Sequence, residues 1–153
     1  MEFVPQAVAG ALLVALTISL QCAGMAGLIH WARAFLLNRL HGFGTIHSAL
    51  LMVRFTSVIV ILHMLQILLW AGFYRWSCLR SWESAFYFSM ANYSTVGSGD
   101  VSLPPMWRTL GTLESITGVL MCGLSVSFVF AVVLRLVERQ DRTVPQYEMK
   151  LRE

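Results

Sequence analysis

The segment from Thr95 to Asp100 has residue types and a spacing that could do chemistry. It reads Thr-Val-Gly-Ser-Gly-Asp, so hydroxyls, two glycines and a carboxylate lie within a few residues. Glycine adopts backbone conformations that other residues avoid, which lets successive carbonyls turn to one side. Residues 75–109 contain no histidine or lysine to activate Ser98 or Asp100. Catalysis is therefore poorly supported, and we expect no enzyme.

A short helix is predicted immediately before this segment. Ser81 can cap the helix, and Glu83 lies in its first turn, where the helix dipole favours a negative charge. Residues 82–93 are mostly apolar and aromatic and make about three turns, which is too short to cross a membrane. Pro104 and Pro105 are expected to prevent regular structure before the next helix.

Three long apolar segments surround these elements. The chain of 153 residues is 57% hydrophobic and only 12% charged, whereas a soluble domain usually carries about 25% charged residues. Residues 7–29, 55–74 and 115–134 carry no charge. About 20 helical residues cross the hydrocarbon core of a lipid bilayer. We therefore predict an integral membrane protein with spanning helices at 7–30, 48–74 and 110–136.

Basic residues are distributed unevenly around these spans. Eight of the eleven lysines and arginines follow the first span, begin the second or lie in the tail. By the positive-inside rule, the C-terminus is cytoplasmic, and the N-terminus and residues 75–109 face outward. The net charge of +3 is small, so nucleic acid is not expected as a partner. A compact chain of this kind fits a bacterial inner membrane.

A short helix and a glycine-containing segment that return to the same side predict a re-entrant loop. Lipid cannot hydrogen-bond exposed backbone, so such a loop survives at membrane depth only where protein buries it or water lines it. The chain shows no internal repeat and supplies one loop. Several copies around an axis are therefore needed to enclose it.

These residues resemble the signature loop of the potassium-channel superfamily, Thr-Val-Gly-Tyr-Gly-Asp, over about residues 75–136. The resemblance implies an all-α fold with three membrane-spanning helices, a re-entrant pore helix and a filter loop, assembled as a four-fold homotetramer. It implies that backbone carbonyls replace the hydration shell of permeant K⁺, with no organic cofactor. Asp100 at the outer mouth would concentrate monovalent cations. The implied filter residues are Thr95, Val96, Gly97, Ser98 and Gly99, with K⁺ held at the first four.

The resemblance also divides the chain. Residues 1–47 would form an extra N-terminal transmembrane helix, packed peripherally, and a cytoplasmic basic loop. Residues 48–136 would form the pore domain, with its outer helix, pore helix, filter and inner helix. Residues 137–153 would form a short cytoplasmic tail.

Residues outside the filter receive supporting roles from the same resemblance. Tyr87 and Phe88 stand where the family carries aromatic residues that brace the filter, and Tyr87 is expected to hydrogen-bond Asp100. Glu114 is expected to contact the pore helix, because an ionisable group there avoids lipid. Gly118 and Gly123 are candidates for a hinge in the inner helix. The cavity face of that helix is expected to include some of Gly118, Cys122, Ser125 and Val129.

One filter position departs from the family. Ser98 replaces the usual Tyr or Phe, whose ring packs against the pore-helix aromatics, and its small side chain leaves that space unfilled. Potassium conduction is the first interpretation. The alternatives are a non-selective monovalent cation channel and a non-conducting accessory subunit. A membrane enzyme acting on lipid is less well supported, because no base accompanies Ser98 or Asp100.

Polar and sulfur-bearing residues elsewhere have simpler interpretations. Gln21, His63 and Gln66 are predicted to hydrogen-bond between helices. The histidines are not at metal-ligand spacing, so no metal site is predicted. The three cysteines provide no disulfide framework, and free thiols are expected at Cys22, Cys78 and Cys122. Cys78, which lies in a loop, could alternatively link subunits.

Overall fold

The chain folds as a series of helices, described over residues 3–38 and 45–150 in a computed structural model. The helices are α1 (Phe3–Asn38), α2 (Thr45–Ser77), α3 (Trp82–Tyr93) and α4 (Arg108–Lys150), with a 3₁₀ turn, η1 (Pro105–Trp107), at the head of α4. Residues 39–44 of the predicted basic loop and residues 151–153 of the predicted tail lie outside the described residues.

Three of the helices are long and apolar enough to cross a membrane. The candidate spans are Val4–Arg33, Ala49–Ser77 and Pro105–Arg135. A helix satisfies its own backbone hydrogen bonds, which is what the hydrocarbon core of a bilayer requires of a spanning segment. The prediction of three spanning helices in an all-α membrane fold is confirmed, although the first and third spans begin a few residues earlier than predicted.

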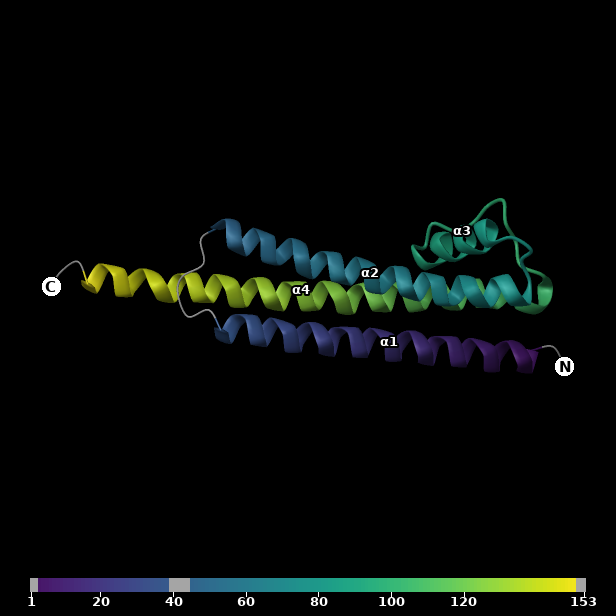
Figure 1. Cartoon of the computed structure of the whole chain (residues 1–153). Coiled ribbons are helices and arrows are strands. Elements are labelled where there is room, and N and C mark those ends of the chain that lie inside the picture. The colour runs from purple at the N-terminus through teal and green to yellow at the C-terminus, as the bar shows by residue number, and fades with distance from the viewer. Residues whose placement is uncertain (1–2, 39–44, 151–153) are drawn as a thin grey trace.

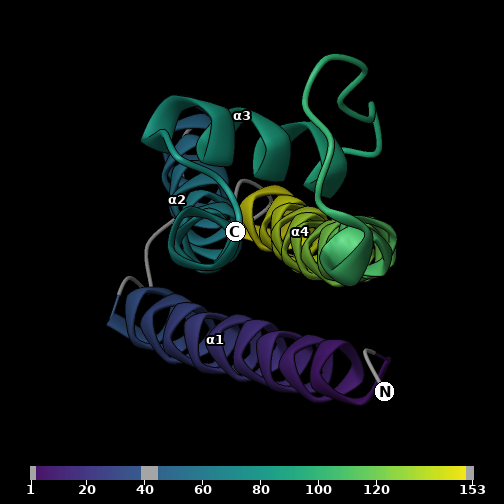
Figure 2. The ribbon, with the colours of Figure 1, turned by 90° about the vertical axis from the view of Figure 1, so that its right-hand side faces the viewer.

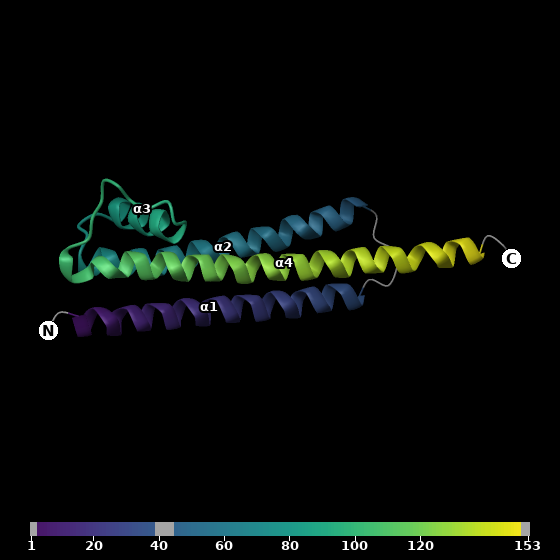
Figure 3. The ribbon, with the colours of Figure 1, turned by 180° about the vertical axis from the view of Figure 1, so that it is seen from behind.

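The three long helices run side by side, and α3 lies at one end of them (Figures 1 and 3). Viewed along the bundle, α1 lies on one side of α2 and α4, and α3 lies on the other side (Figure 2). The N-terminal end of α1 shares the α3 end of the bundle, while α4 runs on to the opposite end (Figure 1). The N-terminus and α3 therefore lie on the same side of any membrane that the bundle spans.

An aromatic core holds α3 against the bundle. Trp70 and Tyr74 of α2 are fully buried there, with Phe88 of α3 and Leu110 of α4. The rings of Tyr74 and Phe88 meet edge to face, with centroids 5.0 Å apart and planes at 86°. Aromatic rings favour this arrangement because the positive edge of one meets the negative face of the other.

Helix α1 is attached to the bundle by polar contacts. Gln6 donates to the carbonyl of Met106 and accepts from the hydroxyl of Thr109. The indole N–H of Trp70 donates to the hydroxyl of Thr17 at 3.0 Å. Lipid tails are as apolar as leucine, so packing and hydrogen bonds between helices matter more here than burial of apolar surface.

Helix α3 begins and ends where the sequence predicts. Its N-cap Ser81 has extended backbone and accepts the N–H of Ser84 at 3.0 Å, and Glu83 lies in the first turn. The last helical residue is Tyr93. The expectation for the prolines is wrong, because Pro105 begins the η1 turn. Proline is tolerated in the first turn of a helix, where its missing N–H is not needed.

Candidate functional site

The loop that follows α3 folds back on the end of that helix. The N–H groups of Ser94, Thr95 and Gly97 donate at 3.1, 2.9 and 2.9 Å to the carbonyls of Met90, Asn92 and Ala91, respectively. These carbonyls would otherwise lack partners at the helix end. Within the described part of the chain, the carbonyl oxygens of residues 95–98 accept no hydrogen bond. The loop therefore presents a short row of free oxygens.

Two residues of the loop adopt left-handed backbone. Gly97 has φ 78°, which its lack of a Cβ allows. Thr95 has φ 64°, which strains a residue with a side chain by about 1–2 kcal/mol. Gly99, for which an unusual conformation is predicted, is not left-handed. The left-handed residues are therefore Thr95 and Gly97, whereas the sequence predicted Gly97 and Gly99.

Little of the chain covers the outer surface of this loop. Val96 is 81% exposed, and Gly99 and Asp100 are also exposed. An apolar side chain and free carbonyls therefore lie uncovered at the same place. Lipid cannot hydrogen-bond free carbonyls, so at membrane depth this loop needs water or further protein around it.

A cavity of about 480 Å³ lies behind the loop. Its walls come from α3, the loop and the start of α4, and include Phe88, Asn92, Ser98 and Arg108. The Ser98 hydroxyl donates to the carbonyl of Val101 at 2.9 Å, so the side chain bonds to its own loop. The space that a larger side chain at position 98 would occupy is open, in agreement with the sequence analysis.

Glu114 of α4 is fully buried and joins three helices. Its Oε1 accepts from the hydroxyl of Ser89 in α3 at 2.5 Å, and its Oε2 accepts from the hydroxyl of Tyr74 in α2 at 2.8 Å. A buried carboxyl group needs such partners. The predicted contact between Glu114 and the short helix is present. Sequence reasoning missed Tyr74 and Ser89, whose only signal was a hydroxyl in an apolar segment.

The two aromatic residues predicted to brace the loop have different surroundings. Phe88 is buried and packs closely over Gly111, where a Cβ would lie 3.2 Å from the ring. Tyr87 is 42% exposed and makes no hydrogen bond to Asp100. Adjacent residues on a helix point about 100° apart, so burying Phe88 turns Tyr87 outward. The predicted bond between Tyr87 and Asp100 is therefore absent within one chain.

Gly118 lets α4 approach the end of α3 closely. A Cβ at this position would lie 2.3 Å from the carbonyl oxygen of Tyr93, so only glycine fits without a shift. A Cβ at Gly123 would meet nothing within 4 Å. Helix α4 is continuous through both positions. A hinge at either glycine stays a prediction, while the contact gives Gly118 a packing role.

Of the predicted cavity face of α4, Cys122, Ser125 and Val129 line a pocket of about 470 Å³ between α2 and α4, whereas Gly118 packs against Tyr93. Gly118 and Ser125 are buried, Val129 packs against an apolar core, and only Cys122 of the predicted set is exposed. The apolar spans contain no polar stripe that would reveal their rotation, so packing decides which face is free. The exposed residues that share a face with Cys122 at helical spacing are Val119, Val126 and Phe130.

The prediction that three polar residues of the spans hydrogen-bond between helices is confirmed. Gln21, His63 and Gln66 each hydrogen-bond to a neighbouring helix. All three cysteines are free thiols. The Cys78 thiol donates to the carbonyl of Tyr74 at 3.5 Å, and burial raises its pKa to about 11.

The arrangement of a short helix and an uncovered loop between two spanning helices matches a known family. The model of that family, described as "Ion channel", matches residues 49–135, which is more than half of the chain. The match includes the α3 helix and the loop and leaves out α1. No curated protein and no solved structure matches the chain. The free carbonyls after a short helix and the family match agree, and this integral membrane protein belongs to the ion channel family of the pore-loop superfamily.

Proposed function

We propose that four copies of this chain form a passive K⁺ channel whose narrowest part is lined by the backbone carbonyls of residues 95–98. The observation that carries the proposal is that these carbonyl oxygens accept no hydrogen bond from residues 3–38 and 45–150. K⁺ must lose its water to pass a narrow pore, and rings of carbonyl oxygens replace that water. The hydroxyl of Thr95 adds an inner oxygen, and Asp100 concentrates cations at the mouth.

The channel requires several copies because a single loop encloses nothing. Copies around an axis cover the exposed Val96 and turn the free carbonyls toward ions and water. The resemblance of the loop to the potassium-channel signature supports four copies. The exposed Tyr87 is then free to reach Asp100 of a neighbouring copy, a contact that one chain does not make.

The charge distribution orients the proposed channel. Eight of the eleven lysines and arginines lie on the side assigned to the cytoplasm, together with the C-terminus. The N-terminal end of α1 and helix α3 share the other end of the bundle, so both face outward (Figure 1). The location proposed is a bacterial inner membrane.

A non-selective monovalent cation channel is the second candidate, and the cavity behind Ser98 favours it. Ser98 bonds to Val101 and leaves about 480 Å³ open between the loop and α3. Discrimination between K⁺ and Na⁺ depends on the size of the oxygen cage and on the number of its oxygens. A loop that is not braced from behind can relax and accept both ions.

Ion flux into liposomes that contain only this chain tests both candidates. Fast K⁺ flux with little Na⁺ flux supports the potassium channel, and equal flux of both ions supports the non-selective one. Absence of flux in a preparation that retains its tetramers contradicts both and favours a non-conducting accessory subunit.

Gly97→Ala is expected to abolish flux and leave the tetramer intact. A Cβ at position 97 meets nothing within 4 Å, so the change acts only on the left-handed backbone, at about 1–2 kcal/mol per chain. Gly27→Ala is the control, because a Cβ at Gly27 also meets nothing within 4 Å and this residue lies in α1, away from the loop. Flux and tetramer content measured on the same preparations decide the question. Normal flux in Gly97→Ala would refute the role of this loop.

A further inference from the structure

Five polar side chains from all four helices form a closed ring of hydrogen bonds. The Gln66 amide donates to Gln21 at 2.7 Å, and the Gln21 amide donates to the hydroxyl of Ser125 at 3.0 Å. His63 joins Ser125 and Tyr93, with its Nε2 at 3.1 Å and its Nδ1 at 2.8 Å from the two hydroxyl oxygens. The Tyr93 hydroxyl closes the ring by donating to Gln66. The ring thus joins α1, α2, α3 and α4 at one level of the bundle.

Each member donates once and accepts once around this ring. Tyr93 gives its proton to Gln66, so it accepts from His63, and this places the imidazole proton on Nδ1. Nε2 is then the acceptor for the hydroxyl of Ser125, which itself accepts from Gln21. Hydrogen bonds that run in one direction polarise and strengthen one another. Only a neutral His63 lets all the hydrogen bonds of the ring run in one direction.

Tyr93 connects the ring to the loop. It is the last residue of α3, and Thr95, where the row of free carbonyls begins, follows two residues later. Its side chain is buried in the ring, while its carbonyl lies against Gly118 of α4. The base of the loop is therefore held at one residue through both side chain and backbone.

We propose that this ring positions the ion-conducting loop, and that protonation of His63 opens it. The inference rests on the proposed channel function. A proton on Nε2 turns that nitrogen into a donor, so the Ser125 hydroxyl must reverse its hydrogen bond and the bonds no longer run in one direction. The imidazolium is also buried without a counter-charge, and relief of this cost loosens the packing that holds Tyr93. Helix α1, which lies outside the family match, takes part in conduction because Gln21 closes the ring.

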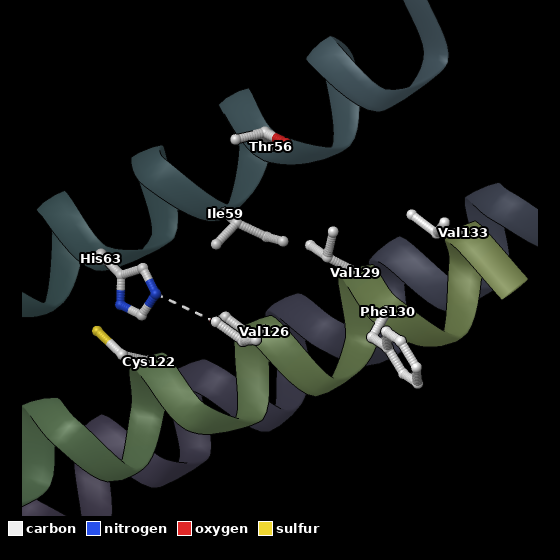
Figure 4. Close-up of a pocket in the computed structure, with 9 residues that line it drawn as sticks. Thr56, Ile59, His63, Cys122, Val126, Val129, Phe130 and Val133 are labelled. Atoms are coloured by element: carbon white, nitrogen blue, oxygen red, sulfur yellow. Dashed lines mark hydrogen bonds between the residues drawn. The ribbon is translucent and has the colours of Figure 1, made fainter. Parts of the chain in front are cut away.

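The groups that face His63 offer no counter-charge to an added proton. Its titratable neighbours are Tyr93 from α3 and Cys122 from α4, whose side chain lies beside the imidazole (Figure 4). Helix α1 contributes the uncharged Gln21, and the Glu114 carboxylate is already bonded to two hydroxyls. His63 also lines a pocket of about 470 Å³ between α2 and α4.

Hydrogen exchange of the loop amides tests the positioning role at two pH values. The N–H groups of Thr95 and Gly97 bond to α3, so their protection factors, corrected for intrinsic rate, report how firmly the loop is held. In the full-length wild type in liposomes, we expect protection to fall about tenfold from about pH 7.5 to about pH 5. The K⁺ flux should change over the same pH range.

Histidine variants isolate the group responsible. His63→Gln keeps a donor and an acceptor and does not titrate, so its protection factors and flux should respond less to pH than those of the wild type. His30→Gln replaces an exposed histidine of α1 and should behave as the wild type. Asp100 and Glu114 are present in all three proteins, so their contributions cancel in the comparison.

Two further variants open the ring without adding a charge. Tyr93→Phe deletes one hydroxyl and should show, at neutral pH, the low protection of the acidified wild type. Gln21→Leu opens the same ring from α1. The double variant should lose no more protection than either single variant, because one missing hydrogen bond already opens the ring. Additive losses would indicate independent packing effects and overturn the proposal.

The flux of the wild type separates this inference from the proposed function. A wild type that conducts, with the same pH dependence of protection and flux as His63→Gln, contradicts the ring. A wild type that does not conduct contradicts the channel, and the protection factors of its loop still decide whether the ring holds Tyr93.

Discussion

The loop after α3 and the side chains that hold α3 in place use polar groups in opposite ways. Glu114, Ser89 and Tyr74 satisfy one another inside a single chain and are buried. A few residues away, the carbonyls of residues 95–98 accept no hydrogen bond from the described residues, and Val96 is exposed. The first region is complete in one copy, whereas in the proposed channel an ion and further copies complete the second. Changes in the first should therefore act on stability, and changes in the second on flux.

The largest effect is expected for the packed region. Glu114→Ala leaves the buried hydroxyl of Tyr74 without an acceptor and leaves Ser89 only the carbonyl of Ile67, which should lower the free energy of unfolding by about 2–3 kcal/mol. Thermal unfolding of the purified protein in detergent measures this change. Glu83→Ala is the control, because Glu83 is exposed in the first turn of α3 and should matter by less than about 1 kcal/mol. Equal decreases in the free energy of unfolding for the two variants would contradict the stabilising role assigned to Glu114.

The next effect concerns the backbone contact between α4 and α3. Gly118→Ala places a Cβ 2.3 Å from the carbonyl oxygen of Tyr93, so the helices must separate, at about 1–3 kcal/mol. Gly123→Ala meets nothing within 4 Å and should leave stability unchanged or slightly higher, because alanine favours the helix. Unfolding measured on both variants checks the difference. Equally stable variants would show that the close approach is wrong.

A smaller effect is expected from filling the cavity behind the loop. Ser98→Tyr places an aromatic ring beside Phe88, which should raise the K⁺/Na⁺ permeability ratio by up to about tenfold. Ser98→Ala is the control, since it removes the bond to Val101 without filling the space. Flux of the two ions through liposomes gives the ratio. An unchanged ratio in Ser98→Tyr would mean that the cavity has no influence on selectivity.

The last comparison concerns the reactivity of a thiol at the edge of the packed region, which should affect neither stability nor flux. Burial raises the pKa of Cys78 to about 11, so less thiolate is present at neutral pH than for an ordinary cysteine. With Cys22 and Cys122 changed to Ser, alkylation of Cys78 at about pH 7.5 should be on the order of a hundredfold slower than that of a cysteine introduced at the exposed Ser77. The rate should rise with pH until about 11. Equal rates would show that Cys78 is not buried.

Local patterns were enough to predict the elements of this fold. Charge-free runs marked the three spans, because a charge inside lipid is costly. Ser81 and Glu83 marked the start of α3, and the run of Ser, Thr and Gly after Tyr93 marked its end. Each of these signals depends only on residues that are close in the sequence, so the packing between helices does not alter it.

The contacts between elements were harder to predict, because they depend on helix rotation. The spans are apolar on all faces, so their pattern does not tell which side of α4 meets α3. For that reason Gly118 was grouped with a cavity face, although it packs against Tyr93 of α3. The left-handed backbone of Thr95 was not predicted, because it depends on how the loop packs on α3. The contact of Tyr87 with Asp100 is not made within one chain and stays a prediction for neighbouring copies.

The central claim is that carbonyls of residues 95–98 from four copies surround a passing ion. A high-resolution structure of the assembled protein in K⁺ tests it most directly. The account predicts a four-fold axis with ion density between successive rings of these oxygens. A structure that places residues 95–98 against lipid, or shows no axial passage, would contradict it.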